Sequence, residues 1–104
     1  MDQPVKMFTV EEASQLLGRV APLVQQLQGL QKSIVKTNHQ LEGAVQKLSA
    51  GNGYPIRAIR EQIERLTRHQ LELIEAFRSA LQQLEDLGCV LKDLTKGLVD
   101  FYAL

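Results

Sequence analysis

The chain has 104 residues, enough for one domain, and its 12 Lys and Arg residues are balanced by 12 Asp and Glu residues, so the formal net charge is zero. This balance argues against a dedicated binder of nucleic acid or of anionic membranes, because such proteins use an excess of basic residues to displace counterions. Aromatic residues make up only 5% and Trp is absent, which disfavours a surface for stacking bases.

The cysteine content and the hydropathy pattern indicate a cytoplasmic protein. Cys89 is the single cysteine, so it has no partner for an intramolecular disulfide, as in proteins of a reducing compartment. The chain lacks the roughly 18 consecutive apolar residues of a membrane span, and its first residues lack the layout of a signal peptide. We expect no membrane contact and no cofactor.

A first helical arm is predicted over residues 9–49. Thr9 is a capping residue, Phe8 is placed to pack on the first turn, and apolar residues then follow in the 3-4 spacing of a helix that packs along a partner helix. The two columns of this seam are Ala13, Val20, Leu27, Ile34, Leu41 and Leu48, and Leu16, Leu23, Leu30, Thr37 and Ala44.

Pro22 is the irregular residue of this arm. Its ring would clash with the carbonyl group of Gly18, so we expect a break or kink near residues 18–21. Residues 9–20 would then form either a separate short helix or the bent beginning of a long one.

Residues 50–54 are predicted to form a turn, followed by a second helix over residues 55–87. Gly51 and Gly53 end the first arm, Pro55 suits the first turn of the next helix, and Gly88 is placed to stop it in a left-handed conformation. The seam columns of this helix are Ile56, Ile63, Gln70, Phe77 and Leu84, and Ile59, Leu66, Leu73, Ala80 and Leu87. Outside the seam, Arg and Glu residues alternate at i,i+4 spacing and mark a solvated face.

The short connection requires the two helices to run antiparallel. Folding the chain at the turn brings Ile34 near Gln70, and the neighbouring seam residues into the pairs Leu41 with Ile63 and Leu27 with Phe77. Thr37 and Gln70 are polar residues on this apolar seam. They either fix the register or the oligomeric state, or lie in a wet stretch, and the sequence does not choose between the two.

The C-terminal extension, residues 88–104, changes character. It is too short and too interrupted by glycine for another long helix, and two runs, Val90–Asp93 and Leu98–Tyr102, flank a Leu-Thr-Lys-Gly turn. We expect a short β-hairpin or an irregular tail here. The predicted fold class is mainly α, a coiled-coil-like helical hairpin with this extension.

The apolar surface is wider than a two-helix hairpin can bury. One interpretation is self-association, most simply two hairpins that form a four-helix bundle as a homodimer. The other is that the C-terminal extension folds back over the apolar residues at the open end; the two are compatible. The interface candidates are Leu17, Val24, Leu71, Ile74 and Leu81, with Val45 also beside the seam.

The remaining titratable residues favour structural roles over chemistry. His39 and His69 are expected at the surface, because neither has a second ligand at metal-binding spacing. Cys89 follows a helix C-terminus, where the dipole disfavours a thiolate, so a buried thiol is a better interpretation than a nucleophile. Three charged residues of the extension either line a small polar site, form cross-strand ion pairs or are simply solvated; they are Lys92, Asp93 and Asp100.

The two ends of the chain resemble a known family. The N-terminal motif is Met7-Phe8-Thr9-Val10-Glu11-Glu12-Ala13, leading into Leu16-Leu17-x-Arg19-Val20-x-Pro22-Leu23, and the C-terminal one is Leu87-Gly88-Cys89-Val90-Leu91-Lys92-Asp93-Leu94 with Gly97-Leu98-Val99-Asp100-Phe101. Both are similar to the bacterial family called domain of unknown function 2203 (DUF2203). Members often have Pro where Gly18 stands and continue into further strands that this chain lacks. The resemblance implies a small bacterial cytosolic protein and supplies no activity.

Two functional hypotheses follow. The first is a non-catalytic interaction or assembly module that binds itself or another protein through its helical faces, and not an enzyme. The second is a ligand-binding protein or minor enzyme with its site in the C-terminal extension.

Overall fold

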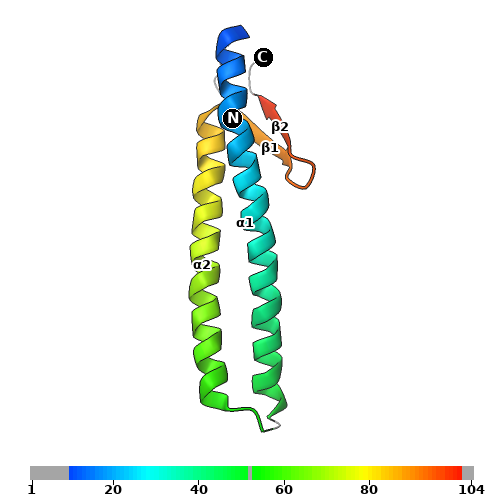
Figure 1. Ribbon diagram of the computed structural model, residues 1–104, viewed down its shortest axis with the longest axis vertical. Helices are drawn as coiled ribbons and strands as arrows, with labels where there is room; N and C mark the ends of the chain where they lie inside the picture. Colours follow the sequence, from blue (N-terminus) through cyan, green and yellow to red (C-terminus); the bar gives the residue numbers. More distant parts are fainter. Residues whose placement is uncertain (1–9, 52, 102–104) are drawn as a thin grey trace, which may run out of the picture. The chain divides into compact units, whose positions relative to one another are not determined.

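The computed structural model describes residues 10–51 and 53–101, with side chains from residue 15 onward. Helix α1 spans Val10–Ala50 and helix α2 spans Ile56–Asp86, followed by strands β1, Cys89–Asp93, and β2, Leu98–Phe101. Figure 1 shows this order, two long helices and then a β-hairpin, which confirms the predicted fold class. The predicted cap at Thr9, the contact of Phe8 and the strand residue Tyr102 lie outside the described residues.

The chain divides into two compact units. Unit 1 consists of Met1–Gly29 and Phe77–Leu104, and unit 2 of Leu30–Ala76. Unit 1 therefore contains the beginning of α1, the end of α2 and the β-hairpin, whereas unit 2 contains the end of α1, the turn and the beginning of α2. Each unit has its own apolar interior.

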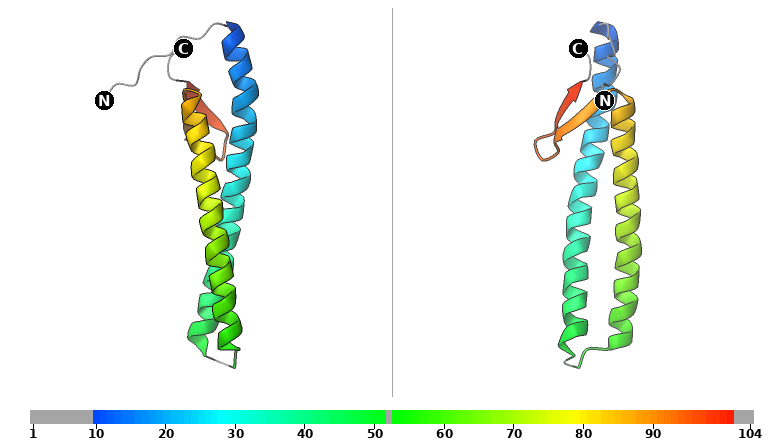
Figure 2. Two further views of the ribbon diagram at one scale, coloured as in Figure 1. Left: turned by 90° about the vertical axis from the view of Figure 1, so that its left-hand side faces the viewer. Right: turned by 180° about the vertical axis from the view of Figure 1, so that it is seen from behind.

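The turn in unit 2 is built on glycine and proline, as the sequence predicts. Gly51 and Gly53 have φ values of 65° and 73°, in the left-handed region that side chains disfavour, and the Gly53 N–H donates to the Gly51 carbonyl over 3.1 Å. The Pro55 carbonyl then accepts the first helical hydrogen bond of α2, from Ile59 over 3.1 Å. The views in Figure 2 show the antiparallel course of the two helices that leave this turn.

The seam of unit 2 combines apolar and polar residues. Ala44 and Ile59 are buried, and so is Thr37, whose hydroxyl donates to the Ser33 carbonyl over 2.8 Å. The Gln70 side chain donates from Nε2 to the Ile34 carbonyl over 2.9 Å, which confirms the predicted pairing of these two residues. Thr37 is shielded from water, and Gln70 links the helices directly. The contact of Gln70 favours a role in setting the register, whereas the Thr37 hydroxyl is satisfied within α1.

The core of unit 1 joins both helices to the hairpin. It consists of Val20, Val24, Leu27, Ala80, Leu84 and Cys89, with Leu91, Val99 and Phe101 of the strands packed against it. Three of its side chains, Leu27, Leu84 and Cys89, are fully buried, so the expectation of a buried thiol is confirmed. Phe77 packs against the cluster that contains Leu27, as the predicted pairing of these two residues requires.

Helix α1 continues through Pro22, so of the two predicted alternatives the separate short helix is wrong and the single long helix is observed; a kink near residues 18–21 stays a prediction. Proline removes the hydrogen bond to the Gly18 carbonyl, but the flanking residues Val20 and Val24 are both buried in the unit 1 core. Their packing holds the turn on either side of the proline in helical geometry. Residues 10–20 are therefore not a separate helix.

Gly88 stops α2 as predicted. Its φ is 85°, and its N–H donates to the Glu85 carbonyl over 2.8 Å, which turns the chain out of the helix and directly into β1. β1 and β2 pair antiparallel, with Leu91 opposite Val99, and Lys92 is an extra residue that forms a bulge. The predicted β-hairpin is confirmed, and the irregular alternative is not observed for residues 89–101.

Candidate functional site

Three charged residues of the C-terminal extension, Lys92, Asp93 and Asp100, form contacts within the hairpin itself. Lys92 Nζ lies 3.0 Å from Asp100 Oδ2 across the strands, and both side chains are more than half exposed. Asp93 Oδ1 accepts a hydrogen bond from the Lys96 N–H over 3.2 Å and so closes the turn. The structure thus gives Lys92 and Asp100 the cross-strand ion pair that the sequence offered as an alternative to a polar site. Asp93 has a turn contact that the sequence did not predict.

The hairpin turn is fastened to α1. Gln28 donates from Nε2 to the Leu94 carbonyl over 2.9 Å, and the same carbonyl accepts from the Gly97 N–H over 3.1 Å. Gly97 lies so close to α1 that an added Cβ would be 3.4 Å from Gln28 Nε2 and 3.6 Å from Val24 Cγ1. This contact covers Val24.

Val24 is therefore not an interface residue. The sequence placed it on excess apolar surface, but it is only 8% exposed and belongs to the unit 1 core. Leu81 is also partly buried against this core. The fold-back of the extension explains both. By contrast, Leu17, Leu71 and Ile74 are 57%, 59% and 39% exposed, and an interface role for them stays a prediction.

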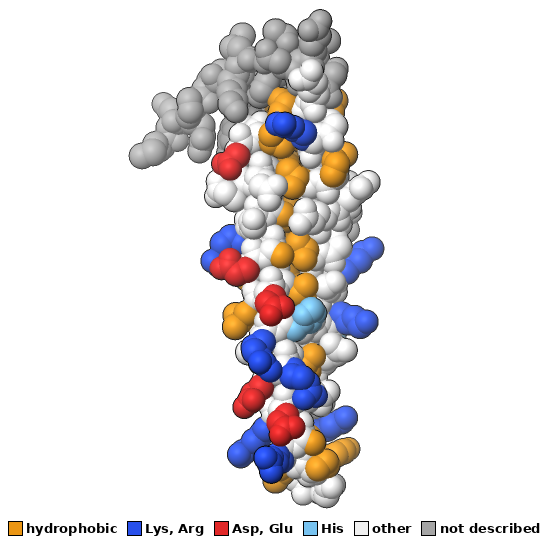
Figure 3. Space-filling model, turned by 60° about the vertical axis from the view of Figure 1, so that its left-hand side comes forward, with side chains coloured by type: hydrophobic (Ala, Val, Ile, Leu, Met, Phe, Trp, Pro, Cys, Tyr) orange, Lys and Arg blue, Asp and Glu red, His pale blue; other side chains and the backbone are white. Residues whose placement is uncertain are grey.

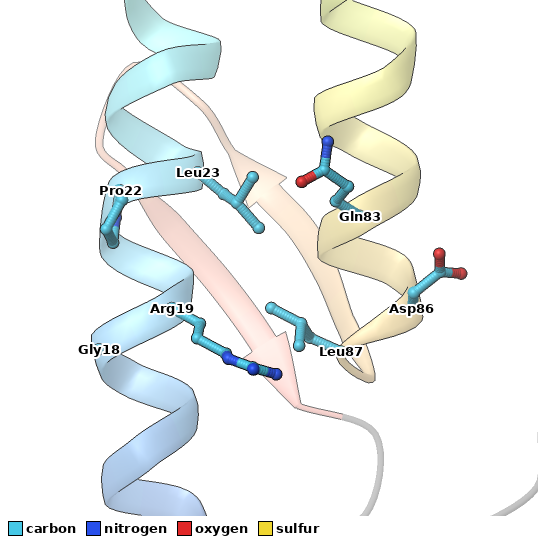
Figure 4. Close-up of a pocket in the computed structure, with 7 residues that line it drawn as sticks. All are labelled: Gly18, Arg19, Pro22, Leu23, Gln83, Asp86 and Leu87. Carbon is cyan, nitrogen blue, oxygen red and sulfur yellow. The ribbon is translucent and has the colours of Figure 1, made fainter.

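Unit 1 has a shallow pocket between α1 and the end of α2. Its volume is about 490 Å³, and Figure 4 shows Leu23 and Leu87 pointing toward one another at its centre. Arg19 reaches along its edge, whereas the Asp86 carboxylate points away from it. Gly18, Pro22 and Gln83 complete the lining. A smaller hollow of about 330 Å³ lies on the other side of α1, where Leu17 meets Gly97 and Val99.

Among the described residues, unit 2 has more exposed large hydrophobic side chains than unit 1. Among its described residues, six large hydrophobic side chains are exposed, and five of them come from the helices. They are Val35 and Val45 on α1, at 50% and 48% exposure, and Ile56, Leu71 and Ile74 on α2, at 51%, 59% and 39%. The sixth is Tyr54 in the turn, 45% exposed, with Lys47 Nζ 5.8 Å from the centre of its ring.

These five side chains lie on one side of the helix pair. At 100° per residue, Ile56, Leu71 and Ile74 follow the same side of α2 as Ile63 and Thr67. A groove of about 520 Å³ joins Ile63 and Thr67 to Leu41 and Val45 across the helix boundary. We call this side, made of the five exposed side chains and this groove, the open face of unit 2.

Polar and charged side chains border the open face. Asn38, Glu42 and Gln46 line the groove on α1, and a second hollow of about 440 Å³ on α2 is lined by Ile63, Thr67, Glu64 and Arg68. Hydrophobic side chains also lie between Lys, Arg, Asp and Glu side chains on the side of the molecule that Figure 3 draws. An apolar strip with a charged border is the usual composition of a protein-binding surface.

The sequence identified only part of this face. Leu71 and Ile74 were predicted and Val45 was noted beside the seam, but Val35 was missed and Ile56 was assigned to the buried seam. The signal for the α1 residues is present as a second 3-4-3 spacing, at Val35, Asn38, Glu42 and Val45. Two of these four residues are polar, and that conceals the pattern.

The described residues show no group of three or more His, Cys, Asp or Glu that could hold a metal ion. His39 is exposed with Nδ1 3.8 Å from Glu42 Oε2, and His69 is also exposed, as predicted. In the part of the chain that the structure describes, neither helix has a stretch long and apolar enough to cross a membrane.

The fold and its surfaces define a class: a two-helix hairpin with a C-terminal β-hairpin and an exposed apolar face. Residues 6–104 match the model of a family described as "Uncharacterized conserved protein (DUF2203)", and the chain belongs to this family. This confirms the resemblance of the two end motifs. Comparisons with curated proteins and with solved structures find no match.

Proposed function

We propose that the protein is a non-catalytic interaction module in the cytoplasm and that the open face of unit 2 is its binding surface. One observation carries this proposal: the exposed side chains of Ile56, Leu71 and Ile74 follow one side of α2, and the groove on that side also reaches the exposed Val45 of α1. Scattered exposed apolar residues are ordinary, but a gathered set on one side marks a surface that another protein covers.

The helical geometry of the open face supports a partner that binds through a helix. The groove runs between two antiparallel helices, and its apolar residues recur at three- and four-residue spacing. Such a groove accepts the side chains of another helix laid along it, because helix surfaces interlock as ridges and grooves. The charged residues of the extension give less support to a catalytic alternative, since the hairpin uses them in its own contacts.

Site-specific photo-cross-linking in the full chain tests this proposal. A photoreactive phenylalanine analogue replaces Val45 or Ile74 on the open face, or, as a control, Lys36, which is exposed on another side of α1. In source cells we expect a cross-linked adduct of one defined mass from both face positions and not from position 36. The same adduct from position 36, or none from the face, would contradict the proposal.

A further inference from the structure

We propose that the occupant of the open face is a second copy of this chain, related to the first by a two-fold axis perpendicular to the helices. In this arrangement α2 packs antiparallel on α2 of the partner subunit, and α1 on α1 of the partner subunit. The inference rests on the proposed function and adds the identity and orientation of the partner. Three independent patterns on the open face carry it.

The first pattern is the symmetry of the exposed residues of α2. Ile56 and Ile74 lie nine residues either side of position 65, and Ile63 and Thr67 lie two residues either side of the same position. In a two-fold antiparallel pair, a residue before the centre faces the residue equally far after the centre. Ile56 would therefore meet Ile74 of the partner subunit, and Ile63 would meet Thr67 of the partner subunit, along about 27 Å of helix.

The second pattern is the same symmetry on α1. Val35 and Val45 lie five residues either side of position 40, and Asn38 and Glu42 lie two residues either side of it. Two-fold pairing would place valine on valine and the Asn38 amide beside the Glu42 carboxylate of the partner subunit. Both contacts are favourable: the Asn38 amide donates to Glu42 of its own chain over 3.1 Å, and its second N–H can donate to the Glu42 carboxylate of the partner subunit.

The two centres lie at the same level of unit 2. The hydrogen bond from Gln70 to Ile34 shows which residues of the antiparallel helices are level, and counting from it places position 40 of α1 beside residues 64 and 65 of α2. The groove agrees, because it brings Leu41 and Glu42 together with Ile63 and Thr67. A single axis therefore serves both helices, as an isologous dimer requires.

The direction of the open face also fits a four-helix bundle. At 100° per residue, the exposed stripe of α2 is turned by roughly a right angle from the seam residues that face α1. The exposed stripe of α1 is turned by about the same amount from its own seam. In a bundle of four helices each helix contacts two neighbours at about this angle, so the partner hairpin completes the bundle.

The third pattern is charge. Glu64 and Arg68 lie two residues either side of position 66 on the border of the open face, and Arg57 and Glu75 lie nine residues either side of it. In the two-fold pairing centred on position 65, each of these residues lies about 3 Å along the helix axis from a residue of opposite charge on the partner subunit, an offset that the long Glu and Arg side chains can span. A parallel arrangement would instead set each residue against its own copy, with like charges in contact. The border therefore selects the antiparallel pairing.

A charge-swap experiment on the full chain tests the proposal. Glu64→Arg and Arg68→Glu each place like charges across both symmetric contacts, so we expect each single variant to dimerise roughly tenfold more weakly than the wild-type chain in sedimentation equilibrium. An equimolar mixture of the two variants restores opposite charges at both contacts. We expect the mixture to form a heterodimer with an affinity close to that of the wild-type dimer.

The equimolar mixture distinguishes the effect of the substitutions on contacts between chains from their effect on contacts within one chain. Glu64 and Arg68 are also i,i+4 neighbours, but each variant has the same unfavourable internal pair whether it is alone or mixed. The control is Arg65→Glu, a charge reversal at an exposed position on a side of α2 away from the open face, and we expect no change in dimerisation. Glu61 is left in place because its carboxylate lies 3.6 Å from Arg57 Nε. Circular dichroism verifies that all variants remain helical.

Each outcome decides the proposal. Heterodimer recovery supports it, whereas a mixture no tighter than the single variants, or a dimer that ignores these charges, would overturn the pairing. A wild-type chain that stays monomeric at high micromolar concentration would exclude the second copy as occupant. In that case the cross-linking experiment still judges the proposed function, through an adduct whose mass is not twice that of the chain.

Discussion

Gly97 lies where the hairpin turn meets α1, and its missing side chain permits both the turn and the contact. Its φ is +68°, and a Cβ there would be 3.4 Å from Gln28 Nε2. Gly97→Ala should lower the free energy of unfolding by about 1–2 kcal/mol, because an L side chain is strained in this conformation. Urea denaturation followed by circular dichroism measures the change.

Gly29→Ala is the matched control for Gly97→Ala. Gly29 lies inside α1, with nothing within 4 Å of an added Cβ. Gly29→Ala should therefore raise the free energy of unfolding by about 0.5–1 kcal/mol, since alanine loses less backbone entropy than glycine in a helix. Equal effects of the two substitutions, in size and in sign, would refute this account of Gly97.

At the scale of the element, Pro22 is the clearest test of how packing overrides local preference. α1 runs through it without interruption, so the helix lacks one hydrogen bond at the Gly18 carbonyl. Pro22→Ala restores the N–H donor and should stabilise the chain by up to about 3 kcal/mol in thermal or urea unfolding. A loss of stability would mean that the proline ring contributes packing that the alanine methyl group does not supply.

The elements and their order were predictable because their signals are local. Heptad spacing, the Gly-Asn-Gly-Tyr-Pro turn and Gly88 each depend on a few neighbouring residues, and the short turn leaves only an antiparallel pairing. The sequence left open whether the helix continues through Pro22, because the answer depends on Val20 and Val24 packing against residues from the other end of the chain.

The candidate surface was harder to predict for the same reason. Periodicity finds apolar residues beside a seam, but it does not show which of them a distant segment covers. Val24 is covered by the hairpin turn at Gly97, whereas the side chain of Leu71 is 59% exposed. The roles of Lys92 and Asp93 likewise depend on the strand bulge, and alternating charge in the sequence does not reveal a bulge.

At the scale of the whole molecule, substitution of a buried leucine should change the stability of the fold, whereas substitution of an exposed leucine should change the association of chains. Leu27 is fully buried in the unit 1 core, so Leu27→Ala should lower the free energy of unfolding by about 3 kcal/mol. Because the same core holds the strands, hydrogen exchange should show weaker protection of the β1 and β2 amides in this variant. Unchanged protection there would show that the hairpin does not depend on that core.

Leu71→Ala is the counterpart on the open face. At a protein concentration low enough to keep the chain monomeric, its effect on unfolding should stay within about 0.5 kcal/mol, because the side chain is exposed. Its effect should appear in the dimer dissociation constant measured by sedimentation. A large loss of monomer stability would instead show that Leu71 supports the fold of unit 2.

The complete burial of Cys89 makes its thiol a natural probe for opening of the unit 1 core. Its thiol is the single one in the chain and lies in the core that joins the helices to the hairpin. A thiol reagent can therefore react only when that core opens. When closing is fast, the labelling rate of the folded chain divided by that of the unfolded chain equals the equilibrium constant for opening. The native sequence thus allows the equilibrium constant for opening of the unit 1 core to be measured without an added probe.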